Sequence, residues 1–179
     1  MGENIEFIEF YCNDSDMDEI AELYCKTFLA KDYSRKEKQL AIQNITKHAN
    51  YKGFKGLKAK DGKGNIVGFS YGYTSVPEQF YRQKIAEQLS ETECKTWLYN
   101  SFEFVELAVS PYFRRLGIAS KLHDMLIENI DHRTTVLTTR IDNNPAINLY
   151  RKKGWKLIKN NAPVISENNL QVILGKEIN

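Results

Sequence analysis

Hydrophobic and polar residues change their spacing several times along the chain, and each change marks an expected element. Residues 5–11 alternate and residues 102–109 form a mostly apolar run, and both patterns are typical of strands. Residues 53–60 and 66–74 flank the turn sequence Asp-Gly-Lys-Gly-Asn at 61–65, so these two runs predict an antiparallel hairpin. Further strands are expected at residues 134–140, 155–158 and 170–174.

Helical spacing predicts the segments between these strands. Residues 17–29 follow the capping residues at 13–16, and residues 118–130 repeat apolar side chains at intervals of three and four. Asparagine and proline at 142–145 begin a short helix over residues 146–152. Two less regular helices are expected over residues 34–47, with Leu40, Ile42 and Ile45 buried, and over residues 78–89.

The order of these elements predicts an α/β fold. The early hairpin makes part of the sheet antiparallel, whereas a helix between the strands at 102–109 and 134–140 makes that connection parallel. We therefore expect a mixed sheet with helices on both faces. A length of 179 residues, without a repeat or linker, predicts a single domain over residues 1–179.

The composition narrows the possible partners. A net charge of +2, with 42% apolar and 27% charged residues, is that of an ordinary globular protein and gives little support for nucleic acid as a partner. The three cysteines are widely spaced, which argues against a disulfide framework or a structural zinc site. The N-terminal residues lack a secretion pattern and no apolar run approaches membrane-spanning length, so we expect a cytoplasmic protein without a membrane partner.

Residues 109–121 join a strand end, a basic glycine loop and a helix start. The unpaired amides and the dipole at a helix N-terminus attract anions. Gly117 lets the backbone approach an anion closely, Ala119 and Ser120 keep the first turn small, and Arg114 and Arg115 add positive charge. The segment predicts a phosphate-bearing ligand. It lacks the Gly-Lys-Ser/Thr ending of a P-loop, which excludes that class of nucleotide hydrolase.

Two motifs together carry a family resemblance. Residues 114–119, Arg-Arg-Leu-Gly-Ile-Ala, fit the (Gln/Arg)-x-x-Gly-x-(Gly/Ala) loop of the GNAT superfamily of N-acetyltransferases. Residues 143–155 resemble its Asn-x-x-Ala-x-x-(Leu/Phe)-Tyr-x-x-x-Gly-(Phe/Trp) segment, and the stronger match spans residues 102–158. Leu116 replaces a common polar residue and Ala119 a common glycine, departures that the family pattern tolerates.

The resemblance implies a fold and a reaction. The fold is a mixed, mostly antiparallel sheet whose central parallel strands, here 102–109 and 134–140, splay apart. The reaction moves an acetyl group from acetyl-CoA to a primary amine of a small molecule or peptide, by direct attack without a covalent enzyme intermediate and without a metal. The resemblance assigns these residues to the coenzyme: Leu107, Ala108, Val109, Arg114, Arg115, Leu116, Gly117, Ile118, Ala119, Ser120 and Asn143.

Direct transfer needs a proton acceptor for the amine and a proton donor for the leaving thiolate. Tyr150 matches the family tyrosine that faces the coenzyme sulfur, and a phenol with a pKa of about 10 is able to donate. Glu103 matches a glutamate that some members use as the base, whereas Glu106 lies on the other face by strand alternation. Ordered water is a third possibility. Each assignment has a structural alternative: Tyr150 packs as a core aromatic residue, and Asn143 caps the following helix.

The sequence leaves the acceptor and the oligomeric state, monomer or homodimer, open. A non-catalytic acyl-CoA-binding or sensing module on the same fold is the alternative function. One group of aromatic residues either lines an acceptor pocket, favouring an apolar or cationic amine, or packs in the core. Its members are Tyr71, Tyr73, Phe80, Tyr81, Trp97 and Tyr99.

Overall fold

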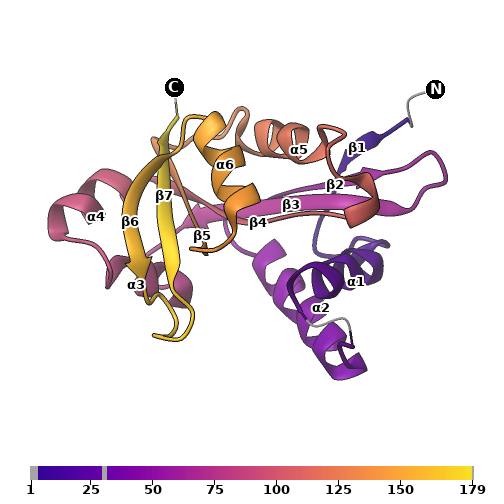
Figure 1. The fold of residues 1–179 in the computed structure, drawn as a ribbon, viewed down its shortest axis with the longest axis horizontal. Coiled ribbons are helices and arrows are strands. Elements are labelled where there is room, and N and C mark those ends of the chain that lie inside the picture. The colour runs from indigo at the N-terminus through magenta and orange to yellow at the C-terminus, as the bar shows by residue number, and fades with distance from the viewer. Residues whose placement is uncertain (1–3, 30–31, 179) are drawn as a thin grey trace. The chain divides into compact units, whose positions relative to one another are not determined.

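The structure, a computed structural model, describes residues 4–29 and 32–178 and contains a mixed sheet with helices (Figure 1). The strands are β1 (Glu6–Glu9), β2 (Lys55–Lys60), β3 (Ile66–Ser75), β4 (Ser101–Val109), β5 (Thr134–Arg140), β6 (Lys156–Ala162) and β7 (Gln171–Glu177). The helices are α1 (Met17–Phe28), α2 (Arg35–Ala49), α3 (Phe80–Ala86), α4 (Glu91–Trp97), α5 (Ile118–Ile127) and α6 (Asn144–Lys152), with a 3-10 turn η1 (Pro111–Phe113).

The hydrogen-bonded strand order is β1-β2-β3-β4-β5-β7-β6. Strands β4 and β5 pair in parallel, whereas β1 with β2, β2 with β3, β5 with β7 and β6 with β7 pair antiparallel. This confirms the predicted α/β fold, its hairpin and its parallel crossover. The chain divides into a first compact unit, Met1–Tyr73 with Val105–Glu128, and a second, Thr74–Phe104 with Asn129–Asn179.

In the first unit, α1 and α2 lie on one face of the strands and α5 on the other (Figure 1). Helix α2 begins with a capping box in which Ser34 and Glu37 exchange hydrogen bonds. Ala41 and Ile45 are buried four residues apart, so they define the helix face that enters the core. The prediction that Leu40 is buried is wrong: it is 47% exposed, because it lies about 100° around the helix from Ala41.

Helix α5 packs tightly on the sheet of this unit at Gly68. A Cβ added there would lie 3.1 Å from a Leu122 methyl carbon and 3.2 Å from both the Ala108 carbonyl oxygen and an Ile118 methyl carbon. Lys55 of β2 secures the other end of α5, since its Nζ donates to the carbonyl oxygens of Met125 and Glu128, each at 2.7 Å. Such lysine contacts satisfy carbonyls that a helix C-terminus leaves unpaired.

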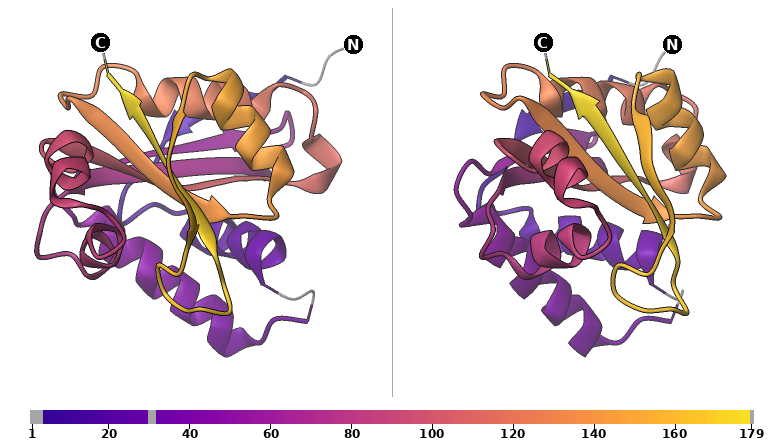
Figure 2. Two further views of the ribbon diagram at one scale, coloured as in Figure 1. Left: turned by 60° about the vertical axis from the view of Figure 1, so that its left-hand side comes forward. Right: turned by 90° about the vertical axis from the view of Figure 1, so that its left-hand side faces the viewer.

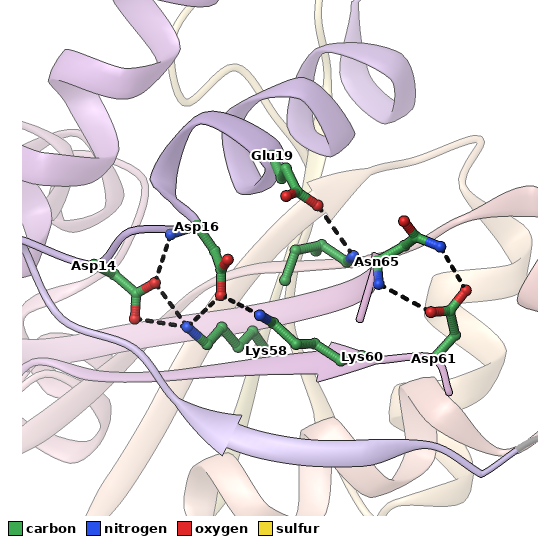
Figure 3. A network of polar contacts seen from close by, with 8 residues as sticks. Asp14, Asp16, Glu19, Lys58, Lys60, Asp61 and Asn65 are labelled. Atoms are coloured by element: carbon green, nitrogen blue, oxygen red, sulfur yellow. Dashed lines mark hydrogen bonds and ion pairs between the residues drawn. The ribbon is translucent and has the colours of Figure 1, made fainter. Parts of the chain in front are cut away.

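A buried ion cluster ties the start of α1 to β2 (Figure 3). Lys58 is 6% exposed, and its Nζ lies 2.7 Å from an Asp14 oxygen and 2.6 Å from an Asp16 oxygen. Lys60 reaches the same Asp16 oxygen at 2.6 Å. Asp16 therefore acts through these lysines, because its side chain makes no capping hydrogen bond to α1. The cation neutralises carboxylates that would be costly to bury alone.

In the second unit, α3 and α4 cover one face of β5 and β7, and α6 covers the other (Figure 2). Ile85 and Leu98 from the helical segment pack with Val136 and Ile173 from the strands. The single helix predicted over residues 78–89 is shorter, and α4 follows it with its own capping box between Ser90 and Glu93. The Ser-x-x-Glu spacing at residues 90–93 is a sequence pattern that indicates the start of a helix, so α4 could have been predicted from it.

The closing strands are longer than their apolar runs. The pairing of β5 with β7 continues to Thr134 opposite Glu177, although the last residues of β7 are polar. Backbone pairing therefore extends a strand beyond the residues that mark it in the sequence. Over residues 4–29 and 32–178, no helix combines the length and apolar character needed to cross a bilayer.

Candidate functional site

The glycine loop leads from β4 into α5 through two left-handed residues. Arg115 has φ +64° and Gly117 has φ +80°, and Gly117 occupies the N-cap position of α5. A Cβ added at Gly117 would meet no atom within 4 Å among the described residues, so the space above the first helical turn is open. Open first-turn amides behind a left-handed glycine are the geometry that binds a phosphate group.

The side chains of the loop divide into outward and inward groups. Arg114, Arg115 and Leu116 are exposed, and Ile118 is 2% exposed and anchors the first turn in the core. Ala119 and Ser120 are half-buried. The structure therefore brings exposed cationic side chains together with the start of α5, as the sequence predicts for a phosphate site.

The C-terminal half of β4 leads directly into this loop. Ala108 and Val109 are buried and Leu107 is half-buried. The amide of Ser110 donates to the carbonyl oxygen of Val67 at 2.8 Å, which holds the strand end in place. Strands β4 and β5 pair in parallel from Ser101, opposite Thr134, to Glu103, opposite Val136. Strand β4 continues beyond this paired segment to Val109.

Glu106 is a strongly perturbed carboxyl of the first unit. It is half-buried between Val105 and Leu107, and desolvation raises the pKa of its carboxyl from 4.5 to about 8. Tyr24 of α1 lies within electrostatic reach: burial is the main cause that raises the pKa of this phenol to about 12, and the Glu106 charge adds to it. A carboxyl with a pKa near neutrality is suited to proton transfer.

Glu103 has a different environment, within the second unit. Its side chain is 2% exposed. Desolvation lowers the pKa of Arg82 on α3, and the nearby Cys94 thiol and Glu103 carboxylate oppose that shift. A neighbouring guanidinium favours the charged form of a carboxylate. No sequence motif indicated that Arg82 lies near Glu103.

Tyr150 lies on α6 in an aromatic cluster of the second unit. It is 6% exposed, and its ring meets Phe104 at 5.8 Å and Trp155 at 5.5 Å between centroids, both edge to face. The amide of Trp155 donates to the Tyr150 carbonyl oxygen at 3.1 Å. These contacts fix the ring in one orientation. The core packing considered from the sequence is therefore present, and it is compatible with a hydroxyl that acts in catalysis.

Asn143 caps α6. Its side-chain oxygen accepts from the Ala146 amide at 3.4 Å, and its Nδ2 donates to Thr139 Oγ1 at 3.1 Å. Asp142 does not share the cap, because it forms an exposed ion pair with Arg140. Both ends of the Asn143 amide are thus engaged within the second unit, as the structural alternative predicts.

The aromatic residues of the sequence do not form one group. Tyr71 and Tyr73 are each 2% exposed in the first unit, where the Tyr73 ring meets Tyr51 at 4.9 Å and the Tyr71 hydroxyl lies 3.1 Å from His48 Nδ1. Burial lowers the pKa of His48 to about 4, so this histidine is neutral at pH 7. In the second unit, Tyr81 and Trp97 pack against the core, and Phe80 and Tyr99 are exposed.

The family comparison assigns this fold. Residues 17–155, well over half of the 179, match the family described as acetyltransferase (GNAT) family. The chain belongs to this family. The glycine loop, β4, Tyr150 and Asn143 of the acetyltransferase all lie inside the matched range.

Solved structures resemble the acetyltransferase along nearly its whole length. PH1933 from Pyrococcus horikoshii OT3 matches with a TM-score of 0.72 and 21% identity, covering 98% of this chain and 99% of that one. Arabidopsis thaliana NAA60 in complex with acetyl-CoA gives 0.68 and 18%, over 98% and 99%. A chain of the NatC complex bound to Gag peptide and CoA gives 0.67 and 16%, over 98% and 99%. At these identities the likeness shows that the acetyltransferase has the GNAT fold.

Within the described ranges of the acetyltransferase, no group of three or more histidine, cysteine, aspartate or glutamate side chains gathers as metal ligands would. The perturbed groups of the site are instead single side chains, above all Glu106.

Proposed function

We propose that this acetyltransferase moves the acetyl group of acetyl-CoA to a primary amine of a small molecule or peptide, by direct attack and without a covalent enzyme intermediate. The observation that carries the proposal is the glycine loop that follows β4 and η1, together with the desolvated carboxyl of Glu106, which lies three residues before the end of β4. In this arrangement one continuous segment of the first unit supplies both an anion site and a base.

Acetyl-CoA supplies the acetyl thioester for this reaction. We assign its pyrophosphate to the amides of residues 117–120 and to Arg114 and Arg115, because open first-turn amides and guanidinium groups both favour phosphate. Leu107, Ala108 and Val109 would offer their backbone groups to the pantetheine arm, and one of these amides would polarise the thioester carbonyl. Leu116, Ile118 and Asn143 complete the coenzyme set by shaping the loop and capping α6.

Glu106 is the residue to which we assign removal of the amine proton. With its pKa raised to about 8, the carboxylate is a much stronger base than an ordinary glutamate. We assign Glu103 a supporting position beside Arg82 instead, since the two groups interact electrostatically. This reverses the order in which sequence matching ranks the two glutamates.

Tyr150 would donate the proton that the leaving thiolate takes up. Its ring packs edge to face against Phe104 and Trp155, and this packing restrains the position of the hydroxyl group. A phenol of ordinary pKa near 10 remains protonated at neutral pH.

A peptide amine is one acceptor class that deserves testing first. The NatC structure holds a Gag peptide together with CoA, although it is only 16% identical to this chain. A small-molecule amine and the N-terminal amine of a peptide differ in size, but each must lose a proton, and we assign that step to Glu106 in both cases. Both classes therefore belong in the same acceptor panel.

The test is release of free CoA from acetyl-CoA in the presence of that panel. We expect turnover with at least one amine, and a large loss of kcat in Tyr150→Phe with little change in affinity for acetyl-CoA. Coenzyme binding at about 100 times its Kd should stabilise the fold by roughly 2.7 kcal/mol, which a thermal melt detects. Tight coenzyme binding with no turnover on any amine would instead favour a sensing module.

A further inference from the structure

A cavity of about 450 Å³ lies in the second unit, between α4 and the strand ends at which β5 begins and β7 finishes. Its volume is in the range of cavities that hold small organic ligands. The side chains that line it come from α4, from Tyr99 after that helix, from Arg133 and Thr134, and from Glu177. None of them belongs to the residues that we assign to the coenzyme or to proton transfer.

The cavity lies on the face of the sheet that α3 and α4 cover. Thr134 and Val136 are two residues apart on β5, so their side chains share a face. Val136 packs with Ile85 and Leu98 of the helical segment. Tyr150 is on α6, which covers the other face of β5 and β7 (Figure 2). The cavity is therefore separate from the tyrosine to which we assign proton donation.

The inner wall of the cavity is fixed by hydrogen bonds. The Arg133 amide donates to the Asn100 carbonyl oxygen, and the Arg133 carbonyl oxygen accepts from the Ile178 amide, each at 3.0 Å. Thr134 is 4% exposed, and its Oγ1 donates to the Trp97 carbonyl oxygen at 2.8 Å. A wall that is already ordered lowers the entropic cost of binding a ligand.

The lining of the cavity carries more positive than negative charge. Arg133 and Lys95 are both exposed, and no ion pair engages the Arg133 guanidinium within residues 4–29 and 32–178. Lys95 pairs with Glu91 at 2.6 Å, and such an exposed contact contributes little. Glu177 is the acidic side chain of the lining, and Lys156 lies 3.4 Å from its carboxylate.

These groups match a ligand with one carboxylate and an aromatic body. The planar guanidinium of Arg133 fits a carboxylate with two parallel hydrogen bonds. The Tyr99 ring is 70% exposed at the cavity and offers a surface on which a second ring packs. A phosphate group fits less well, because it carries about −1.5 to −2 charges at pH 7 and Glu177 repels the additional charge.

We propose that this cavity is a second ligand site of the protein, which binds a small aromatic carboxylic acid. Arg133 and Lys95 hold its carboxylate, and Tyr99 holds its ring. The site is independent of the proposed function, because it shares no residue with the coenzyme loop, β4 or Tyr150.

The experiment uses phenylacetate as the probe and phenylacetamide as its neutral counterpart of the same shape. NMR titration of the probe signals measures the Kd of each for the full chain. Phenylacetate should bind at least about tenfold more tightly than phenylacetamide, and Arg133→Gln should weaken phenylacetate by about tenfold, because a hydrogen bond to a charged group is lost. Tyr99→Ala should weaken both probes. Arg151→Gln is the matched control, because Arg151 is an exposed arginine of the same unit outside the lining, and it should change neither Kd.

Four results would overturn the site. Phenylacetate that does not bind the wild-type protein, or that binds Arg133→Gln as tightly as wild type, shows that the cavity does not hold it. An equal loss in Arg151→Gln shows general attraction of anions to a basic surface. Inorganic phosphate that binds more tightly than phenylacetate shows that the cavity selects phosphate. These measurements use neither acetyl-CoA nor an amine, so failure of the proposed function would not alter them.

Discussion

Replacement of Glu106 by glutamine should abolish most of the activity while stabilising the fold. Glutamine keeps the size and polarity of the side chain but cannot accept the amine proton. General base catalysis contributes typically about 10²- to 10⁴-fold, so we expect kcat/KM for the amine to fall by that factor in Glu106→Gln. The loss should exceed that of Glu103→Gln, in contrast to the order that motif matching suggests.

The pH dependence of the wild-type enzyme follows from the pKa of about 8 at Glu106. Only the ionised carboxylate accepts a proton, so its active fraction is about 9% at pH 7, about 1% at pH 6 and about 90% at pH 9. Between pH 6 and pH 9, kcat/KM should therefore rise by nearly two orders of magnitude. Dividing the wild-type profile by that of Glu106→Gln removes the ionisation of the amine substrate, which both proteins share.

The stability of the protein should depend on pH in the opposite direction. The carboxyl of Glu106 has a folded pKa of about 8 and an ordinary value of 4.5 when unfolded, so between these values the folded state binds more protons. Stability should accordingly fall as the pH rises from about 4.5 to 8 and then level off. A difference of this size corresponds to at most about 4–5 kcal/mol, and Glu106→Gln should recover part of it at pH 9.

Denaturant unfolding at pH 5 and pH 9 measures this effect, with Glu6→Gln as the control because Glu6 is exposed in the same unit. We expect Glu106→Gln to be more stable than wild type at pH 9 and nearly equal at pH 5. A wild-type activity profile that is flat from pH 6 to pH 9, together with no gain of stability in Glu106→Gln, would refute the desolvation argument.

Three further predictions concern the frame around the site. Lys58→Met should cost about 3–5 kcal/mol in denaturant unfolding, because it leaves buried carboxylates without their cation, whereas Lys95→Met at an exposed pair should cost less than about 1 kcal/mol. Because Lys58 and Lys60 lower the pKa of Asp16, the stability from this cluster is present above pH 4 and should be lost as the pH falls through the lowered pKa. Gly68→Ala should destabilise by about 1–3 kcal/mol and weaken acetyl-CoA binding, since α5 must shift; Gly62→Ala, with nothing within 4 Å of the added Cβ, should be neutral in the same thermal melt. Asn143→Ala should cost about 1 kcal/mol through loss of the α6 cap, and an unchanged melting temperature would contradict that role.

The sequence predicted most elements because their signals are local. The hairpin turn at 61–65 is closed by Asp61, whose side chain accepts from the amides of Lys63 and Asn65, both at 2.9 Å. That chemistry lies within five residues and is readable without knowledge of the fold. The misplaced Leu40 and the extra length of β6 and β7 have a different origin. The exposure of Leu40 depends on which face of α2 meets the sheet, and the strand lengths depend on how far the neighbouring strand continues. A short stretch of sequence encodes neither property.

The same distinction separates the two halves of the site. The proposed phosphate binding depends on the backbone. A left-handed glycine and a small first turn restrict the residue types at 117–120 directly, so this requirement leaves a motif in the sequence. The raised pKa of Glu106, on which its proposed role as a base depends, comes from burial of the carboxyl in the folded chain. Many different side chains can desolvate a carboxyl equally well, so no fixed residue spacing results from that requirement. For this reason motif matching proposes the donor loop directly and favours Glu103 over Glu106 as the base, and the pH profile of the Glu106→Gln variant is the measurement that decides between the two glutamates.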